Sequence, residues 1–204
     1  MERKVIVTAD GSSTIHLEEW NEHYHSIHGA IQEAKHVFIK SGLSLFSDTP
    51  ISILEIGFGT GLNCFITFLE AEKLNLKVDY VGVEAYPVSN EEINCLNYVD
   101  QLKAAEYKSV FNEMHQTKWE IKNSISSNFS LTKRSQFFNE INDVNAFDLI
   151  YFDAFGARVQ PELWTEEIFQ KMFNSLKSNG ILVTYSAKGS VRRAMQTVGF
   201  LVEK

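Results

Sequence analysis

Short apolar runs alternate with helix-length segments along most of the chain. Runs rich in β-branched and aromatic residues predict buried strands at 51–56, 78–83, 148–152 and 181–185. Apolar residues at the spacing of one helix face follow the first run, over 62–69. Parallel strands need helix-length crossovers, so this rhythm predicts an α/β fold, a doubly wound parallel sheet with helices on both faces.

Other parts of the chain carry a weaker pattern. Residues 95–102 predict a helix, and a third strand of the sheet is expected near 129–132. Residues 108–123 fit a helix, a loop or both. Ser178-Asn179-Gly180 predicts the end of a helix before the strand at 181–185, and residues 200–203 predict a last strand.

The first part of the chain has a different pattern. Two β-branched runs, at 4–8 and 14–17, flank Asp10-Gly11, which is a hairpin signal. Residues 29–43 then have helical spacing. We therefore expect an N-terminal hairpin and helix extension at 1–45, followed by the main domain at 46–204.

Composition limits the classes of function. The chain has 204 residues, of which 44% are hydrophobic and 22% charged, as in a soluble protein with one core. Its formal net charge of −7 argues against a surface that attracts nucleic acid everywhere, but it leaves room for a local basic patch. No segment resembles a signal peptide or a membrane span, so we expect a cytoplasmic protein.

The thiols and imidazoles do not indicate a metal site. Cys64 and Cys95 form no Cys-x-x-Cys pair, and we expect both to be reduced thiols. Several histidines cluster near the N-terminus, but no carboxylate or thiolate accompanies them at ligand spacing. These histidines are His16, His23, His25, His28 and His36.

A glycine-rich turn, LEIGFGTGLN at 54–63, joins the first strand to its helix. Glycine reaches positive φ and lets a ligand lie against the main chain. The G-x-G-x-x-G dinucleotide fingerprint does not fit, because its third glycine would fall on Leu62 or Cys64. The turn instead resembles the E-x-G-x-G-x-G loop of class I methyltransferases, which implies S-adenosylmethionine as cofactor. The residues assigned to that cofactor here are Glu55, Gly57, Gly59, Gly61 and Asn63.

Carboxylates end the second and fourth predicted strands. Glu84, followed by Ala85, stands where a carboxylate can accept both ribose hydroxyls of an adenosine, although a solvated loop residue is the alternative. Glu55, inside a buried strand, holds either the glycine loop or the methionine amino group. Asp153 faces the crevice at the sheet edge where ligands bind, and a helix-capping role is its alternative.

Several motifs in order identify a closer resemblance. They are GFGTGLN at 57–63, DAFGARVQPELWTEEIF at 153–169, TYSAKGSVRRAMQTVGF at 184–200, and the spacing from Glu22 through Ile39. Together they resemble the methyltransferase domain of the bifunctional MnmC proteins of tRNA 5-methylaminomethyl-2-thiouridine biosynthesis. The resemblance implies a class I, Rossmann-like fold, S-adenosylmethionine as donor, the 5-aminomethyl group of a tRNA wobble uridine as acceptor, and Asp153 as the catalytic carboxylate. The residues it places beside the substrate are Tyr24, His25, Ser26, Phe155, Arg158 and Trp164.

The chain departs from that family pattern in three places. It has no room for the FAD-dependent oxidoreductase domain, so a stand-alone methyltransferase is expected. Ser135-Gln136 stands where the family has Gly-Asp near the adenine. The sequence stops at Lys204, so the closing strand that follows in relatives is expected to be missing.

A short basic segment provides Lys188, Arg192 and Arg193. These residues either contact tRNA phosphates, with Lys133 and Arg134 joining them, or form a solvated helix start.

The expected reaction needs a neutral amine, because a lysine-like amine with a pKa of about 10.4 is mostly protonated at neutral pH. Asp153 is expected to orient the amine and draw off its proton. Two rivals remain, an aminopropyltransferase-like enzyme acting on a polyamine and a non-catalytic S-adenosylmethionine-binding module. The sequence gives no oligomeric state.

Overall fold

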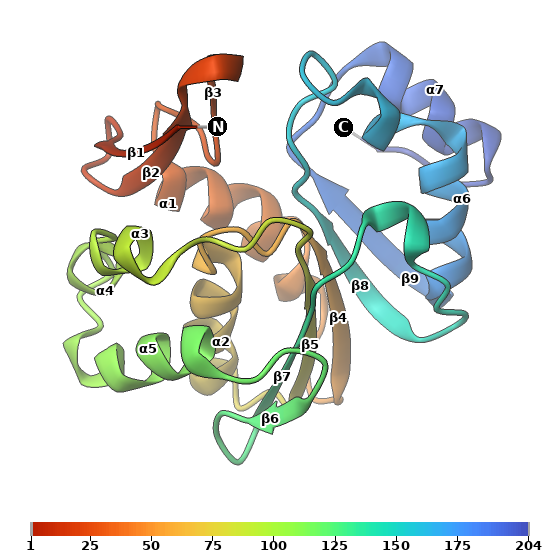
Figure 1. The fold of residues 1–204 in the computed structure, drawn as a ribbon. Helices are drawn as coiled ribbons and strands as arrows, with labels where there is room; N and C mark the ends of the chain where they lie inside the picture. Colours follow the sequence, from red (N-terminus) through yellow and green to blue (C-terminus); the bar gives the residue numbers. More distant parts are fainter. Residues whose placement is uncertain (1, 204) are drawn as a thin grey trace.

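The computed structural model describes residues 2–203, and a six-stranded sheet forms its centre (Figure 1). The strand order is β6-β7-β5-β4-β8-β9, and all neighbouring pairs are parallel except β6 with β7. This arrangement confirms the predicted doubly wound α/β fold. The strands are β4 (Ile51–Ile56), β5 (Val78–Val83), β6 (Lys122–Ser124), β7 (Phe129–Arg134), β8 (Phe147–Phe152) and β9 (Leu176–Thr184).

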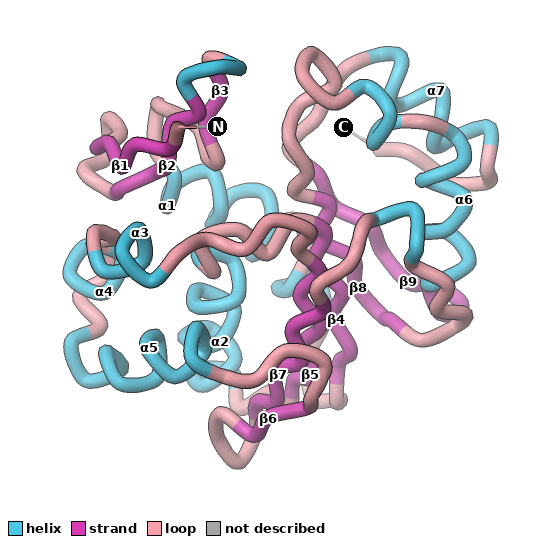
Figure 2. Tube along the Cα trace, viewed as in Figure 1, coloured by secondary structure: helices cyan, strands magenta, loops and turns pink. Residues whose placement is uncertain are grey.

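Helices cover both faces of this sheet (Figures 1 and 2). One apolar core lies under α1, α2, α4 and α5, and a second lies under α6 and α7. Helix α2 is buried nearly all round, as its run of apolar residues requires. The α-helices are α1 (Ala30–Ala34), α2 (Leu62–Leu74), α3 (Asn90–Asn94), α4 (Tyr98–Gln101), α5 (Lys108–Gln116), α6 (Glu166–Ser175) and α7 (Gly189–Thr197).

The N-terminal hairpin forms as predicted. Strands β1 (Arg3–Val7) and β2 (Ser13–Leu17) pair antiparallel, and the short β3 (Glu22–His23) extends this second sheet. The helix predicted at 29–43 begins as α1 and continues as a π-helical segment, Lys35–Lys40. Ala30, Ala34 and Phe38 point from it into the core beside β8 and β9, so the extension packs directly on the main domain.

The segments with a weak pattern resolve into short elements. Of the helix predicted at 95–102, only α4 forms, and a separate short helix, α3, ends just before this range. Residues 108–123 contain both helix and loop and end in the edge strand β6, which the sequence did not indicate. The third strand is present as β7.

Two boundary predictions are wrong. Ser178-Asn179-Gly180 does not end a helix, because α6 already ends at Ser175 and β9 starts at Leu176 to pair with Phe147. The ladder between β8 and β9 shifts register there, and Asn179 takes a positive φ of 63°, so this turn-like tripeptide forms an irregularity inside the strand. Residues 200–203 form no strand, because Phe200 instead folds back on α6, where its ring meets Phe173 at 5.1 Å.

Candidate active site

A cavity of about 810 Å³ opens at the carboxyl ends of β4, β5 and β8. Open α/β sheets bind ligands at this edge. Its wall is completed by the N-terminal unit (the hairpin and helix extension at 1–45), by residues 137–139 and by the segment after β8. Of the residues predicted from the sequence, it is lined by Tyr24, His25, Gly57, Gly59, Glu84, Ala85, Asp153 and Phe155.

The glycine turn supplies main chain rather than side chains to the cavity. Gly57 and Gly59 have φ of 89° and 48°, which side-chain-bearing residues rarely adopt. A Cβ on Gly57 would stand 2.6 Å from the carbonyl oxygen of Asp153, and one on Gly59 would stand 3.0 Å from the Tyr24 ring. The turn therefore needs glycine both for its backbone and for its close neighbours.

Glu84 closes the turn from the neighbouring strand. Its Oε2 accepts from the Gly59 backbone N–H at 3.0 Å, and its Oε1 accepts from the Tyr86 N–H at 2.9 Å. Each oxygen keeps a further lone pair, and the side chain is half-buried at the cavity wall. Glu84 is thus fixed in position with acceptor capacity facing the cavity.

Asp153 lies on the cavity floor, next to the glycine turn. The side-chain amide of Asn63 donates to its Oδ2 at 2.8 Å. Burial raises the pKa of Asp153 to about 7, against the Asn63 hydrogen bond, which lowers it. A carboxyl with a pKa near 7 can accept and release a proton at neutral pH.

Three of the predicted cofactor residues do not line the cavity. Glu55 and Asn63 are buried beneath Asp153, with 0% and 2% of their surface exposed. Gly61 begins helix α2 with φ of 72°, and a Cβ there would meet the His115 ring at 3.0 Å. These residues support the turn from behind.

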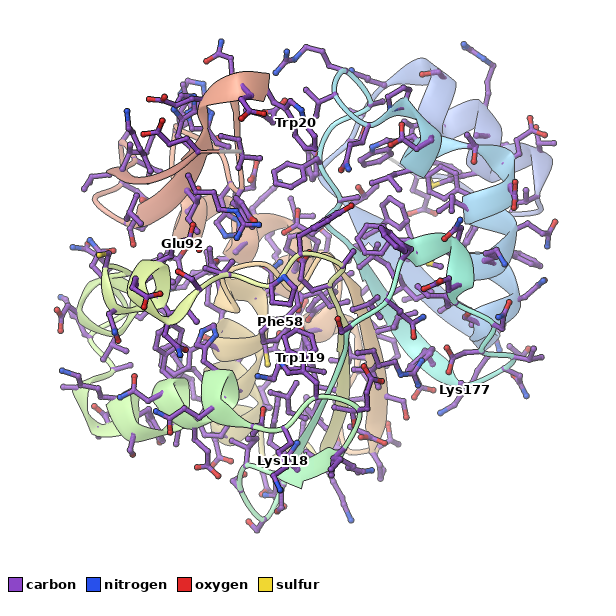
Figure 3. All side chains as sticks on the ribbon, in the orientation of Figure 1. Trp20, Phe58, Glu92, Lys118, Trp119 and Lys177 are labelled. Atoms are coloured by element: carbon purple, nitrogen blue, oxygen red, sulfur yellow. The ribbon has the colours of Figure 1, made fainter. Side chains whose placement is uncertain are left out.

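An aromatic wall lines the cavity together with Asp153. The ring of Phe155 meets Tyr24 edge-on at 5.0 Å and Trp20 edge-on at 5.8 Å. Figure 3 labels Trp20 on the side of the N-terminal unit that faces the C-terminal half. The sequence analysis missed Trp20, although a tryptophan inside the polar run Glu18–Glu22 was a signal of contact with a neighbour or ligand.

The other two residues of the predicted Tyr24-His25-Ser26 group differ in their surroundings. His25 lines the cavity and pairs through Nε2 with the Thr60 hydroxyl at 2.8 Å, while burial lowers its pKa to about 4. Ser26 does not reach the cavity, and its backbone N–H donates to Glu33. His25 is therefore a neutral polar group of the wall at physiological pH.

The structure does not bring Arg158 and Trp164 to the cavity. Arg158 donates to the carbonyl oxygens of Trp20 and Asn21 and forms an ion pair with Glu22 at 2.9 Å. Trp164 is 6% exposed, and its Nε1 donates to the Phe155 carbonyl oxygen at 2.7 Å. Both residues hold the wall in place and neither side chain lines the cavity, and the prediction that they border the substrate stays a prediction.

A further part of the cavity escaped the sequence analysis. Tyr86 and Phe137, which meet edge-on at 5.9 Å, line it together with Phe138 and Asn139. Gln136, which stands where the family has an aspartate near the adenine, does not line the cavity. The side-chain amide that lines this end of the cavity belongs to Asn139.

The basic segment is exposed, but the two residues expected to join it in binding phosphates, Lys133 and Arg134, are occupied elsewhere. Lys188, Arg192 and Arg193 are exposed around the start of α7. Lys133 is 1% exposed and donates to the His115 carbonyl oxygen at 2.6 Å, while Arg134 forms a two-pronged ion pair with Asp143. Burial of Lys133 and pairing of Arg134 remove both from any phosphate-binding surface.

Residues 2–203 hold no group of three or more histidine, cysteine, aspartate or glutamate side chains arranged to bind a metal ion. No helix within the same residues combines the length and apolar character of a bilayer span.

The site can now be compared with known proteins. A model of the family Methyltransf_30, described as S-adenosyl-L-methionine-dependent methyltransferase, matches residues 97–204, more than half of the chain. The chain belongs to this family. S-adenosylmethionine as cofactor and the predicted class I methyltransferase fold are thereby confirmed.

Curated relatives agree with the resemblance drawn from the motifs. The tRNA 5-methylaminomethyl-2-thiouridine biosynthesis bifunctional protein MnmC of Idiomarina loihiensis is 27% identical over 199 residues, covering 89% of this chain and 33% of that protein. The protein of the same name from Leptospira interrogans is 28% identical over 211 residues, covering 92% of this chain and 31% of its own length. The chain spans about a third of the length of these relatives.

Solved structures of this family's fold extend the comparison. MnmC2 from Aquifex aeolicus is 26% identical and superposes with a TM-score of 0.81 over 98% of this chain and 65% of that one. A spermidine synthase from Thermotoga maritima, 14% identical with a TM-score of 0.61, covers 96% of this chain and 60% of its own. The second likeness shows the fold alone.

Proposed function

We propose that the chain transfers a methyl group from S-adenosylmethionine to the 5-aminomethyl group of a tRNA wobble uridine. The observation that carries this proposal is Asp153, a half-buried carboxyl with a pKa near 7 beside the glycine turn. The likeness to MnmC2 and to the MnmC proteins supports tRNA as the acceptor.

The cofactor end of the cavity fits an adenosine joined to an amino acid. Gly57 and Gly59 allow the close approach of a ligand to the main chain, and Glu84 can accept the ribose hydroxyls. Tyr86 and Phe137 offer aromatic faces for the adenine. Ala85 adds an apolar contact next to Glu84. Bound there, S-adenosylmethionine supplies an electrophilic methyl group on its sulfonium.

Asp153 then acts on the acceptor amine. The amine must be neutral to attack, and its ordinary pKa of about 10.4 keeps it protonated in water. A cavity that removes water lowers that pKa, and the Asp153 carboxylate can orient the amine and take its proton. The nitrogen lone pair forms the new C–N bond while the S–C bond breaks, which leaves S-adenosylhomocysteine and a protonated secondary amine, and Asp153 returns to water the proton that it took from the amine.

The aromatic wall suits a uracil base taken out of its stack. Trp20, Tyr24 and Phe155 present ring surfaces beside Asp153. Single-stranded RNA bases are commonly held by stacking on aromatic side chains. His25 adds a neutral polar group, and the exposed Lys188, Arg192 and Arg193 are available to tRNA phosphates. Action on tRNA agrees with the cytoplasmic location expected from the sequence.

The two rival functions explain less of the cavity. A polyamine site would use the carboxylates of the lining, which include Glu84, Asp153, Glu162 and Glu167, but it leaves the aromatic wall without a role. A non-catalytic module has no need of an ionisable carboxyl on the cavity floor. Neither rival accounts for the similarity to the MnmC proteins.

Transfer of labelled methyl to undermodified tRNA tests the proposal. Purified protein is incubated with labelled S-adenosylmethionine and tRNA that carries 5-aminomethyl groups, and the RNA is digested to nucleosides. We expect label in the 5-methylaminomethyl nucleoside and none with tRNA lacking the aminomethyl group. Label in any other nucleoside, or product only with decarboxylated S-adenosylmethionine and a polyamine, would refute it.

A further inference from the structure

A single amide bridges two carboxyl groups beneath the cavity floor. Asn63, the second residue of α2, is 2% exposed. Its Nδ2 donates to Oδ2 of Asp153 at 2.8 Å and to Oε1 of Glu55 at 3.0 Å. An amide nitrogen has two hydrogens, so both are committed to these carboxyls.

A third group fixes the far end of this bridge. The Tyr80 hydroxyl hydrogen-bonds Oε2 of Glu55 at 2.9 Å, and both side chains are 0% exposed. Burial raises the pKa of Glu55 well above its ordinary value and raises that of Tyr80 as well. Burial therefore disfavours a full negative charge on Glu55 beneath Asp153.

We infer that Asn63 is a positioning residue for Asp153, held by Glu55 and Tyr80 so that its N–H group, not its carbonyl oxygen, faces the Asp153 carboxylate. The inference rests on the proposed function, in which Asp153 handles the proton of the amine. It assigns Glu55 and Asn63 to the support of the acid rather than to contact with the cofactor. A rotated amide would set its carbonyl oxygen against an ionised carboxylate, which is repulsive.

The hydrogen bond from Asn63 also affects the pKa of Asp153. Within residues 2–203, Asn63 is the one side chain that donates a hydrogen bond to the Asp153 carboxylate. Burial raises the pKa of Asp153, and the Asn63 hydrogen bond opposes this by stabilising the charged form. The titratable groups that interact with Asp153 are Glu33 from α1, Glu55 from β4, Tyr98 from α4 and Tyr185 after β9. The hydroxyls of Tyr98 and Tyr185 donate to Thr60 and to the Ala154 carbonyl oxygen instead, so neither replaces the Asn63 donor.

The substitution Asn63→Leu removes the donor at similar size. The matched control is Thr67→Val, on the same helix, which removes a buried hydrogen bond to Tyr151 without touching Asp153. Should Asn63→Leu not fold, Asn63→Ser keeps a polar side chain that is too short to bridge the carboxyls, and it serves in its place. The titration of Asp153 is followed by NMR of carboxyl-labelled aspartate, with its signal assigned by loss in Asp153→Asn.

Loss of a hydrogen bond to a charged group is expected to raise the Asp153 titration midpoint by about one to two pH units. The midpoint should stay in place in Thr67→Val. In the methyl-transfer assay, the pH at which kcat reaches half its plateau should rise by the same amount. An unchanged midpoint in Asn63→Leu or Asn63→Ser overturns the inference.

The two readouts separate failure of the inference from failure of the proposed function. The titration needs no substrate, so it stands even when no tRNA is methylated. A shifted titration with an unshifted kcat profile would keep the role of Asn63 and reject Asp153 as the proton acceptor.

Discussion

The two ends of the cavity are built in different ways. The cofactor end comes mainly from two strand ends with the turns that follow them, over 54–63 and 78–86, and it presents main chain and one carboxylate. The acceptor end gathers Trp20 and Tyr24 from the N-terminal unit and Asp153 and Phe155 from the segment after β8. Local backbone chemistry shapes the first end, and contacts between distant segments shape the second.

This difference assigns separate tasks to the two ends. The cofactor end needs positive-φ glycines that no other residue replaces cheaply. The acceptor end needs the N-terminal unit docked in place, which Arg158 secures by binding Glu22 and two backbone carbonyls. A substitution at one end should therefore leave ligand binding at the other end unchanged.

Gly59→Val tests the cofactor end. A valine must hold φ near 48° with its Cβ 3.0 Å from the Tyr24 ring, so strain of about 1–3 kcal/mol is expected. Affinity for S-adenosylmethionine, measured by calorimetry, should fall about 10- to 100-fold. Gly156→Ala is the control, because its Cβ meets nothing closer than 3.6 Å. Wild-type affinity in Gly59→Val would show that the ligand does not lie on this turn.

The pH dependence of protein stability tests one histidine near each end of the cavity. Burial lowers the pKa of His25, at the acceptor end, and of His115, behind Gly61, to about 4. Since the unfolded state binds protons first, stability is complete above about pH 6.5 and is lost as pH falls toward 4. Each imidazole should contribute about 1–2 kcal/mol of loss by pH 5. Chemical denaturation of His25→Gln and His115→Gln should show a flatter pH dependence; an unchanged slope would contradict the buried neutral state.

Trp20→Ala tests the acceptor end. Removal of one ring from the wall should raise KM for tRNA about tenfold, since stacking of a base on an aromatic side chain is worth about 1–3 kcal/mol. Affinity for S-adenosylmethionine should not change. Trp119→Ala, which removes the tryptophan lying over Lys133, is the matched control. Equal effects of the two variants on KM would remove Trp20 from the acceptor site.

The basic segment around α7 is expected to have a smaller effect on tRNA binding than Trp20. Charge reversal of Arg192 and Arg193 together is expected to weaken tRNA binding about threefold to fivefold and to lower the salt dependence by about two ion equivalents. Lys118→Glu, at the opposite end of the molecule in Figure 3, is the control for a charge reversal away from α7, and its effect is compared with that of the single reversal Arg192→Glu. Unchanged affinity and salt slope in the double reversal would leave a solvated helix start as the role of this segment.

The same contrast explains what the sequence could predict. The strands, the glycine turn, Glu84 and Asp153 follow from local patterns, because strand ends and positive-φ glycines are encoded in adjacent residues. The structure brings Tyr24, His25 and Phe155, which the motif resemblance places beside the substrate, to the cavity lining. The sequence could not show that Arg158 and Trp164 lie outside that lining, because residue type does not tell whether an arginine or tryptophan faces a ligand or secures a loop.

Trp20, Tyr86 and Phe137 escaped prediction for a related reason. They come from separate segments, and only the packing of those segments brings them to one cavity. The bridge from Glu55 through Asn63 to Asp153 is also non-local, since it joins β4, α2 and the end of β8. Glu55 gave a signal in the sequence, because a carboxylate in a buried strand needs a partner, but the sequence did not show which residue that partner is.

The most direct test of the account measures turnover and cofactor affinity together in Asp153→Asn. Loss of the proton acceptor should lower kcat about 100-fold or more at pH 8, where the wild-type carboxyl is ionised. The dissociation constant for S-adenosylmethionine should stay within about threefold, because the turn and Glu84 are untouched. A parallel loss of turnover and affinity, or wild-type turnover, would contradict the division of the cavity into a cofactor end and an acceptor end that works through Asp153.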